Sequence, residues 1–105
     1  MKRVPFRIQP LADGDLDDHV RYLRERDPDI ALRFIEATFD AFETLSQTPE
    51  IGAQRRFDSP ALAGLRVWPI PRFERWLIFY IPAGTTIQIV RVLHGARDLP
   101  TILDQ

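Results

Sequence analysis

Three strand-like runs at hairpin spacing constrain the fold of this chain more than any other feature of its sequence. Residues 65–70 (LRVWPI), 75–81 (RWLIFYI) and 86–93 (TIQIVRVL) are rich in aromatic and β-branched side chains, as strands are. The intervening segments, 71–74 and 82–85, are short and contain proline or glycine. Because connections this short join antiparallel neighbours, we expect a three-stranded antiparallel sheet in the C-terminal half.

Two helices are predicted before these strands. Asp13 or Asp15 can cap the first helix, whose apolar residues recur at helical spacing and which should end near Arg26. Asp27 is a capping residue and Pro28 suits the first helical position, so the second helix begins almost at once. Helices joined this tightly fold back on each other as a hairpin.

The second helix should cover residues 28–47 and is apolar on two faces. One stripe, widened by Phe34, consists of Ala31, Ile35, Thr38, Phe42 and Leu45. A second stripe contains Leu32 and Phe39. A helix with two apolar faces has more than one neighbour, so Phe39 is a candidate for contact with a partner.

The remaining segments complete the predicted order. Val4, Phe6 and Ile8 alternate with other residues as in a strand, and Pro5 restricts that strand to an edge or a bulge. Residues 50–64 show no period and form a long, functional or mobile loop, while residues 98–103 can form a last helical turn. The order β-α-α-β-β-β predicts an α+β fold in which a helical hairpin packs on an antiparallel sheet.

Length and composition bound the class of protein. A chain of 105 residues with 45% hydrophobic content can form one core, so residues 1–105 are expected to be a single domain. The sequence contains neither a run of about 20 apolar residues nor the apolar stretch of a signal peptide. It also contains no cysteine. We therefore expect a soluble, cytoplasmic protein without disulfides or thiolate chemistry.

The charge is balanced overall and uneven along the chain. A net charge of -1 and a pI of about 6.1 argue against a protein that binds nucleic acid mainly by neutralising its phosphates, and no direct specific DNA binding is expected. Residues 1–49 nevertheless carry net charge -3, and residues 55–97 contain seven arginines against two acidic residues. Arginine suits planar recognition of carboxylates or phosphates, although genomic base composition is an alternative explanation for the bias.

The sequence lacks a serine nucleophile elbow, a glycine-rich phosphate loop and a complete calcium loop. Ser46 and Ser59 lie outside any nucleophile elbow, and the five glycines form no phosphate-binding loop, so no cofactor is expected. The acidic run that begins at Asp13 lacks the glycine and glutamate of a calcium loop, so no metal site is expected. His19 could share a metal with Asp15, but a helix-surface histidine is the simpler interpretation.

The polar residues on and around the predicted strands leave two interpretations open. They are Arg66, Arg72, Arg75, Tyr80, Arg91, His94 and Arg97. Cleavage of RNA needs a general base, a general acid and cations on the phosphate, which His94, Tyr80 and the arginines could supply. Alternatively, Arg91 and Arg97 pair with Asp98, Glu74 or the acidic first helix, while His94 only ends a strand. Simple alternation places Arg91 on the face of Ile87, Ile89 and Leu93, and places His94 on the opposite face with Gln88, Val90 and Val92.

Four segments, in order, resemble the ParE-like branch of the RelE/ParE toxin superfamily. They are DLDDHVRYLRERDPDIALRF (15–34), LSQTPEIGAQRR (45–56), LRVWPIPRFERWLIFYIP (65–82) and VRVLHGARDL (90–99), of which the last is the most specific. The resemblance covers nearly the whole chain. It implies the toxin of a type II toxin–antitoxin pair, neutralised by a cognate ParD-like antitoxin with a ribbon-helix-helix domain.

Characterised ParE members act on DNA gyrase, whereas RelE members cleave messenger RNA on the ribosome. This chain has a single lysine, Lys2, a slightly acidic balance and no tyrosine after Tyr80, so the nuclease set of RelE looks incomplete. The resemblance therefore implies a toxin that binds gyrase. The alternative is a ribosome-dependent endoribonuclease that uses Arg66, Tyr80, Arg91 and His94. Candidate residues for binding the antitoxin or the target are Arg66, Arg72, Arg75, Arg91, His94, Arg97 and Phe39.

Overall fold

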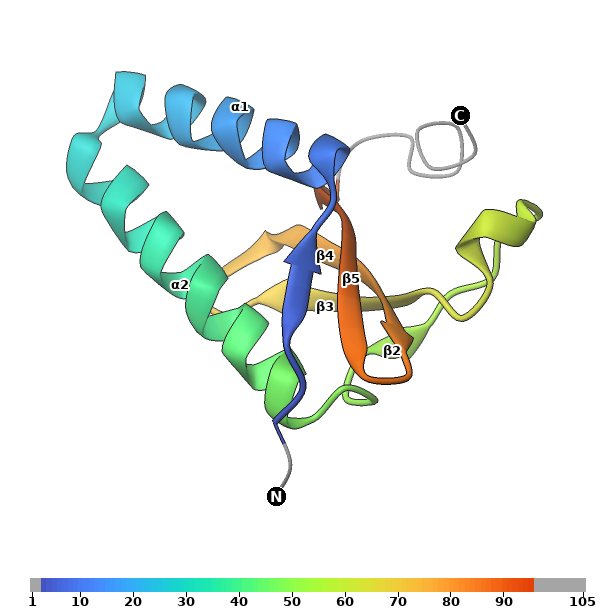
Figure 1. Cartoon of the computed structure of the whole chain (residues 1–105). Helices are drawn as coiled ribbons and strands as arrows, with labels where there is room; N and C mark the ends of the chain where they lie inside the picture. Colours follow the sequence, from blue (N-terminus) through green and yellow to red (C-terminus); the bar gives the residue numbers. More distant parts are fainter. Residues whose placement is uncertain (1–2, 96–105) are drawn as a thin grey trace.

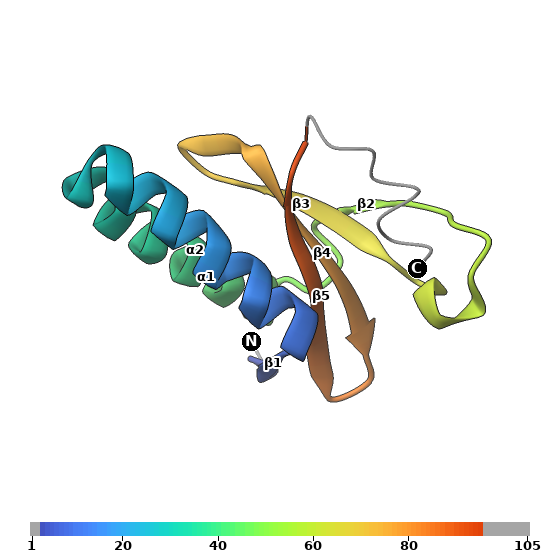
Figure 2. The same cartoon turned by 90° about the horizontal axis from the view of Figure 1, so that it is seen from above.

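The chain forms a helical hairpin on one side of a five-stranded sheet (Figure 1). This is a computed structural model, and it describes residues 3–95. Seen from above, α1 and α2 lie together on the same side of the sheet (Figure 2). The elements in chain order are β1 (Phe6–Ile8), α1 (Pro10–Arg26), α2 (Pro28–Gln47), β2 (Ala53–Gln54), the 3-10 helix η1 (Pro60–Leu62), β3 (Arg66–Ile70), β4 (Phe73–Ala83) and β5 (Thr86–His94). The predicted α+β fold is confirmed, and the helical turn predicted at 98–103 lies outside the described residues.

The first helix begins earlier than its acidic residues suggest. Pro10 occupies the first turn of α1 and Gln9 is the N-cap, with no side-chain cap hydrogen bond. The prediction that Asp13 or Asp15 caps this helix is wrong. Proline needs no backbone donor and has a fixed φ suited to the first helical position, so the helix can start at Pro10. Asp13 lies in the first turn, where a negative charge is favourable.

The second helix starts and ends where the sequence predicts. Asp27 is its N-cap, and the Asp27 carboxylate accepts a hydrogen bond of 2.9 Å from the Asp29 backbone N–H. The main stripe is buried, although Phe34 is fully buried and Ile35 only half-buried. Leu32 and Phe39, the second stripe, remain 60% and 45% exposed. One apolar face of α2 therefore has no complete cover among residues 3–95.

The sheet is mixed, with the strand order β1-β5-β4-β3-β2. The strands β3, β4 and β5 are antiparallel neighbours, as predicted. The expectation of a wholly antiparallel sheet is wrong, because β1 lies parallel to β5 at the edge beyond it. A parallel neighbour needs a crossover connection, and the helical hairpin is part of that connection. The short strand β2 was not predicted within the irregular segment 50–64.

The hairpin turns are tighter than the sequence suggests. Strands β3 and β4 are joined by Pro71 and Arg72, and β4 and β5 by Gly84 and Thr85. Arg72 adopts φ 73°, in the left-handed region that glycine occupies at lower cost. Gly84 has φ 63°. Because both turns are two residues long, β4 extends beyond its predicted limits at both ends.

A bulge in β5 changes which side chains face the helices. Tyr80 pairs with Ile89 and Phe79 with Arg91, so Val90 is an additional residue between the two pairs. Ile89 and Val92 consequently both belong to the core under the helices. The predicted face assignment is therefore wrong across the bulge, because Leu93 lies on the face opposite to Ile87 and Ile89. The prediction that Arg91 and His94 point to opposite faces is confirmed.

Two apolar clusters cover the two faces of the sheet. The larger lies between the helices and the sheet and contains Leu16, Leu23, Phe34, Phe42, Leu45, Ile70, Ile78, Tyr80, Ile87, Ile89 and Val92, among others. The smaller, on the other face, joins Phe79 and Leu93 to Leu62 and Leu65 from the segment around η1. That segment therefore contributes apolar side chains to the second core in addition to linking α2 with β3.

Helix α1 completes the part of β5 that β1 does not reach. The last backbone bond of the parallel pair runs from the Gln9 N–H to the Ile89 C=O at 3.0 Å. Beyond it, the Asp15 carboxylate accepts the Val92 N–H at 3.1 Å, and His19 Nε2 lies 2.7 Å from the Val92 C=O. An unpaired backbone group at this buried strand would be costly. Two side chains of α1 thus supply the hydrogen bonds to Val92 that a neighbouring strand would otherwise make.

We predict that Asp15→Asn destabilises the protein by roughly 2–3 kcal/mol, because it breaks a largely buried ion pair with Arg91 and weakens the bond to Val92. The control is Asp18→Asn. Asp18 pairs with Arg21 at 3.4 Å and both side chains are exposed, so this substitution should lower the stability by less than about 0.5 kcal/mol. Urea denaturation gives both values. Equal losses for the two variants would contradict the role assigned to Asp15.

Candidate partner-binding site

Tyr80 and Arg66 fasten the segment that follows α2 to the sheet. The Tyr80 hydroxyl donates to the Pro49 C=O at 2.8 Å and accepts from the Gly52 N–H at 2.9 Å. Arg66 Nη1 donates to the Glu50 C=O at 2.9 Å and to the Gly52 C=O at 2.7 Å. Both side chains are therefore engaged with the backbone of the chain itself.

The approach between Tyr80 and this segment requires glycine. A Cβ atom at Gly52 would lie 2.6 Å from the Tyr80 hydroxyl oxygen and 2.8 Å from the Val67 carbonyl oxygen. Neither neighbour can move away easily, since one is a buried ring and the other is backbone. Burial raises the pKa of Tyr80, partly offset by the Gly52 hydrogen bond and the positive charge of Arg66. The neutral phenol is thus the form that the fold stabilises.

Arg91 forms a two-pronged ion pair with helix α1. Its Nε and Nη2 atoms donate to the two carboxylate oxygens of Asp15, each at 2.8 Å. The Arg91 and Asp15 side chains are only 17% and 11% exposed, and the hydrogen bond with Asp15 raises the pKa of Arg91. The structural interpretation, in which Arg91 pairs with the acidic helix, is confirmed.

His94, the last residue of β5, lies beside Trp76 of β4 and away from Tyr80. Its ring packs edge-on against Trp76, with 4.9 Å between ring centroids, beside a hollow lined by Glu74, Arg75 and Leu77. Because His94 pairs with Trp76, four residues before Tyr80, the two are separated by about 13 Å along the strand. The structure does not bring Arg66 and Tyr80 together with His94.

Two of the predicted arginines are exposed near the β3–β4 turn. The side chains of Arg72 and Arg75 form no hydrogen bond or ion pair with any of residues 3–95. Arg72 and Phe73 line a shallow hollow together with Arg33 and Glu36 of α2. Arg97 lies outside the described residues. Arg72 and Arg75 are thus available to the carboxylates or phosphates of a partner.

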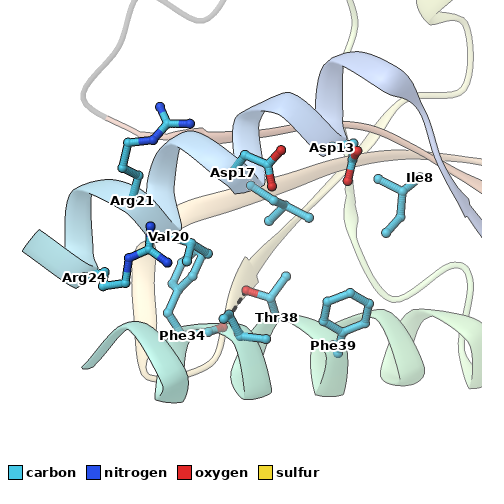
Figure 3. Close-up of a pocket in the computed structure, with 11 residues that line it drawn as sticks. Ile8, Asp13, Asp17, Val20, Arg21, Arg24, Phe34, Thr38 and Phe39 are labelled. Carbon is cyan, nitrogen blue, oxygen red and sulfur yellow. Dashed lines mark hydrogen bonds between the residues drawn. The ribbon is translucent and has the colours of Figure 1, made fainter. Parts of the chain in front are cut away.

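A groove between α1 and α2 contains Phe39 (Figure 3). Its volume is about 380 Å³, and its residues come from β1, α1 and α2: Ile8, Asp13, Leu16, Asp17, Val20, Arg21, Arg24, Phe34, Ile35, Thr38 and Phe39. The sequence identified Phe39 through the second apolar stripe of α2. It gave no signal for the α1 wall, because the crossing of the two helices decides which residues of α1 face that stripe.

The possible metal site at Asp15 and His19 is not formed. Across residues 3–95, no group of three or more histidine, aspartate or glutamate side chains lies close enough to bind a metal ion. His19 was also interpreted as a surface residue, whereas it is half-buried against β5. Its ring lies 6.1 Å from Trp76 and 6.2 Å from Phe34 between centroids. Both residues therefore serve the junction of helix and sheet.

Residues 6–99 match the sequence profile of a family described as the ParE toxin of the type II toxin–antitoxin system parDE. The chain belongs to the ParE toxin family. This ParE-family chain also resembles a solved structure described as the chromosomal ParDE TA system from P. aeruginosa, with a TM-score of 0.68 and 23% sequence identity. The match covers 90% of this chain and 98% of that one and supports the fold. No curated protein matches the sequence.

The described part of this ParE-family chain contains no helix of the length and apolar character needed to cross a membrane. Its longest helix, α2, has one face on the core and the other on the groove.

We predict that Tyr80→Phe destabilises the protein by about 1–3 kcal/mol at neutral pH, because the Gly52 N–H loses its acceptor. The variant should also change the response to alkali. The pKa of Tyr80 is higher in the folded state than in the unfolded state, so its neutral form stabilises the fold. This contribution to the free energy of unfolding is complete below the ordinary tyrosine pKa of 10.0 and is lost as the pH rises through the raised pKa.

Urea denaturation below and above pH 10.0 measures this difference. Stability should fall less steeply with pH in Tyr80→Phe than in the unmodified chain. Tyr22→Phe is the matched control, since Tyr22 is 49% exposed. Identical pH dependence for the two variants would contradict the assignment to Tyr80.

Proposed function

We propose that this ParE-family chain inhibits growth by binding DNA gyrase and that a cognate antitoxin with a ribbon-helix-helix domain neutralises it by direct contact. The observation that carries this proposal is the match of residues 6–99 to the ParE toxin family. The resemblance of four segments to ParE-like sequences supports gyrase as the target. The site of action is then the cytoplasm, where the chromosome is replicated.

The hydrogen bonding of the nuclease candidates supports binding over catalysis. Arg66 and Tyr80 are bonded to the segment after α2, and Arg91 is bonded to Asp15. General acid–base chemistry needs its groups within hydrogen-bond reach of one substrate. His94 lies about 13 Å from Tyr80 along the strand direction, so these two groups cannot serve one substrate as acid and base.

The antitoxin is proposed to cover the groove around Phe39 and the exposed arginines near the β3–β4 turn. Phe39 is a large apolar side chain that is 45% exposed beside a hollow, which is the kind of anchor that partner helices use. Arg72 and Arg75 are fully available to acidic side chains of the same partner. Arg66, Arg91 and His94 would contribute by keeping these surfaces in place, and Arg97 remains a further candidate.

Expression of the chain alone in a bacterial host should arrest growth and induce the DNA-damage response. The purified chain should inhibit supercoiling by gyrase and leave relaxation by a type I topoisomerase unchanged, since the proposed contact is with gyrase and not with DNA. Unchanged supercoiling combined with rapid cleavage of translated messenger RNA would support the endoribonuclease alternative. Loss of that cleavage in a folded His94→Ala variant would then assign a chemical role to His94.

The antitoxin can be taken from the reading frame that neighbours the gene, if that frame encodes a ribbon-helix-helix protein. Phe39→Glu should weaken binding by about 10- to 100-fold, because a charge replaces an apolar anchor, while toxicity without the antitoxin is retained. Leu11→Glu is the control, since Leu11 is 65% exposed and lies outside the groove. Equal binding by the two variants would exclude the groove, and insensitivity to reversal of Arg72, Arg75 and Arg97 together would exclude the electrostatic contact.

A further inference from the structure

The turn between β3 and β4 has an arginine at a position that favours glycine. Pro71 precedes Arg72, and Arg72 has φ 73°. Proline at the second position and a positive φ at the third are typical of a type II turn, whose third residue is usually glycine or asparagine. A larger side chain is strained in this conformation. The Glu74 carboxylate accepts a hydrogen bond of 2.7 Å from the Arg72 backbone N–H and so helps to hold the turn.

The strands beside this turn are irregular. Pairing of β4 with β3 passes directly from Leu77 to Phe73, so residues 74–76 of β4 have no partner in β3. Pro69 lies at this register shift and has no N–H for a strand ladder. Pairing of β4 with β5 begins only at Trp76, so the turn extends past the end of β5 (Figure 2). Bulges of this kind often re-aim side chains beside functional sites.

An aromatic cluster holds the irregular hairpin against α2. The Phe34 ring packs edge-on against Phe73 and Trp76, with 5.4 and 5.5 Å between ring centroids. Phe34 is fully buried in the core between the helices and the sheet. The hairpin is therefore preformed, and a partner would not have to order it on binding.

Three exposed arginines surround the turn. Arg72 and Arg75 come from the hairpin and Arg33 comes from α2, and none of their side chains forms a hydrogen bond or ion pair with residues 3–95. Arg33 and Arg72 line one shallow hollow of about 260 Å³, and Arg72 and Arg75 line another of about 380 Å³. The three guanidinium groups thus belong to one surface. We call this surface, formed by residues 71–76 with Arg33, the hairpin tip.

The charges of the hairpin tip favour a protein partner over a nucleic acid. A guanidinium group can donate two parallel hydrogen bonds to one carboxylate, so three arginines suit an acidic protein surface. Glu36 lines the first hollow and Glu74 the second, so the phosphates of a nucleic acid would have to approach two carboxylates. The net charge of the whole chain is -1, unlike that of domains that neutralise many phosphates.

We propose that the hairpin tip is the surface through which the chain contacts its target, at an acidic patch of the target protein. This inference rests on the proposed inhibition of gyrase, and it adds which surface of the toxin makes the contact and which chemistry that surface recognises. It also explains the strained Arg72. Glycine would relieve the turn but would remove a guanidinium group from the contact.

The substitution Arg72→Gly separates the side chain from the strain. The variant should melt at the temperature of the unmodified chain or a few degrees above it, because glycine adopts a positive φ without steric cost. Half-inhibition of supercoiling by purified gyrase, measured without antitoxin, should nevertheless need about tenfold more of the variant. Arg72→Asn should give the same result, since asparagine also tolerates a positive φ.

A second variant and a matched control test whether the loss belongs to the hairpin tip. Arg75→Glu reverses another charge of this surface and should also weaken inhibition. Arg56→Gly removes an exposed arginine from the irregular segment between β2 and η1 and should leave inhibition unchanged. Thermal unfolding followed by circular dichroism verifies that each variant is folded. Unchanged inhibition by folded Arg72→Gly or Arg75→Glu would overturn the proposal, as would an equal loss in Arg56→Gly.

A nucleic acid as the partner is tested with a fluorescently labelled double-stranded DNA fragment. Fluorescence anisotropy should show no binding of this fragment by the unmodified chain. Binding that is lost in Arg72→Gly would assign the hairpin tip to DNA and would overturn the proposed protein contact.

Growth arrest at matched expression levels separates this inference from the proposed target. If the unmodified chain inhibits gyrase and the Arg72 variants inhibit it equally, this inference alone is refuted. If the unmodified chain arrests growth and leaves gyrase unaffected, the proposed target is refuted. Loss of growth arrest in Arg72→Gly would then support the hairpin tip as the contact with a different protein, and retained arrest would refute the inference as well.

Discussion

The hydrogen bonds between α1 and Val92 are the constraint on which the rest of the structure depends. The parallel pairing of β1 with β5 ends at Ile89, so the next part of β5 needs other partners for its backbone. Asp15 and His19, one turn apart on α1, take the Val92 N–H and C=O. Because both bonds are directional, they fix the position of α1 against the sheet. The place of α2, and the groove between the helices, follow from that position.

Three residues that the sequence presented as nuclease candidates have hydrogen-bond partners within the chain. Arg91 neutralises the carboxylate that completes β5, and Tyr80 and Arg66 position the exit of α2. A buried phenol or a largely buried charge needs a partner, and each of these groups has one within the chain. What the fold leaves unsatisfied is of another kind: an apolar groove, the exposed Phe39, and arginines near a tight turn. These are the features that the proposed binding of a partner would use.

Local features of the sequence predicted the elements well where one residue type has one geometric role. Asp27 with Pro28 located the start of α2, and the short turns identified three antiparallel strands. Prediction was wrong where several residues could play the same role. Any of the acidic residues near Asp13 could cap a helix, but α1 begins at Pro10 without a side-chain cap. The bulge at Val90 was also missed, because no residue at that position requires it.

The sequence by itself determined the type and order of the elements, the second apolar face of α2, and the identity of the charged residues on α1, because periodicity and turn chemistry are local. Only the tertiary structure decided that β1 joins β5 in parallel, that Asp15 meets Arg91, and that His94 pairs with Trp76, four residues along β4 from Tyr80. Pairing between distant segments depends on how whole elements cross and pack. Residues 76 positions apart, such as Asp15 and Arg91, become partners only when the helix lies on the sheet.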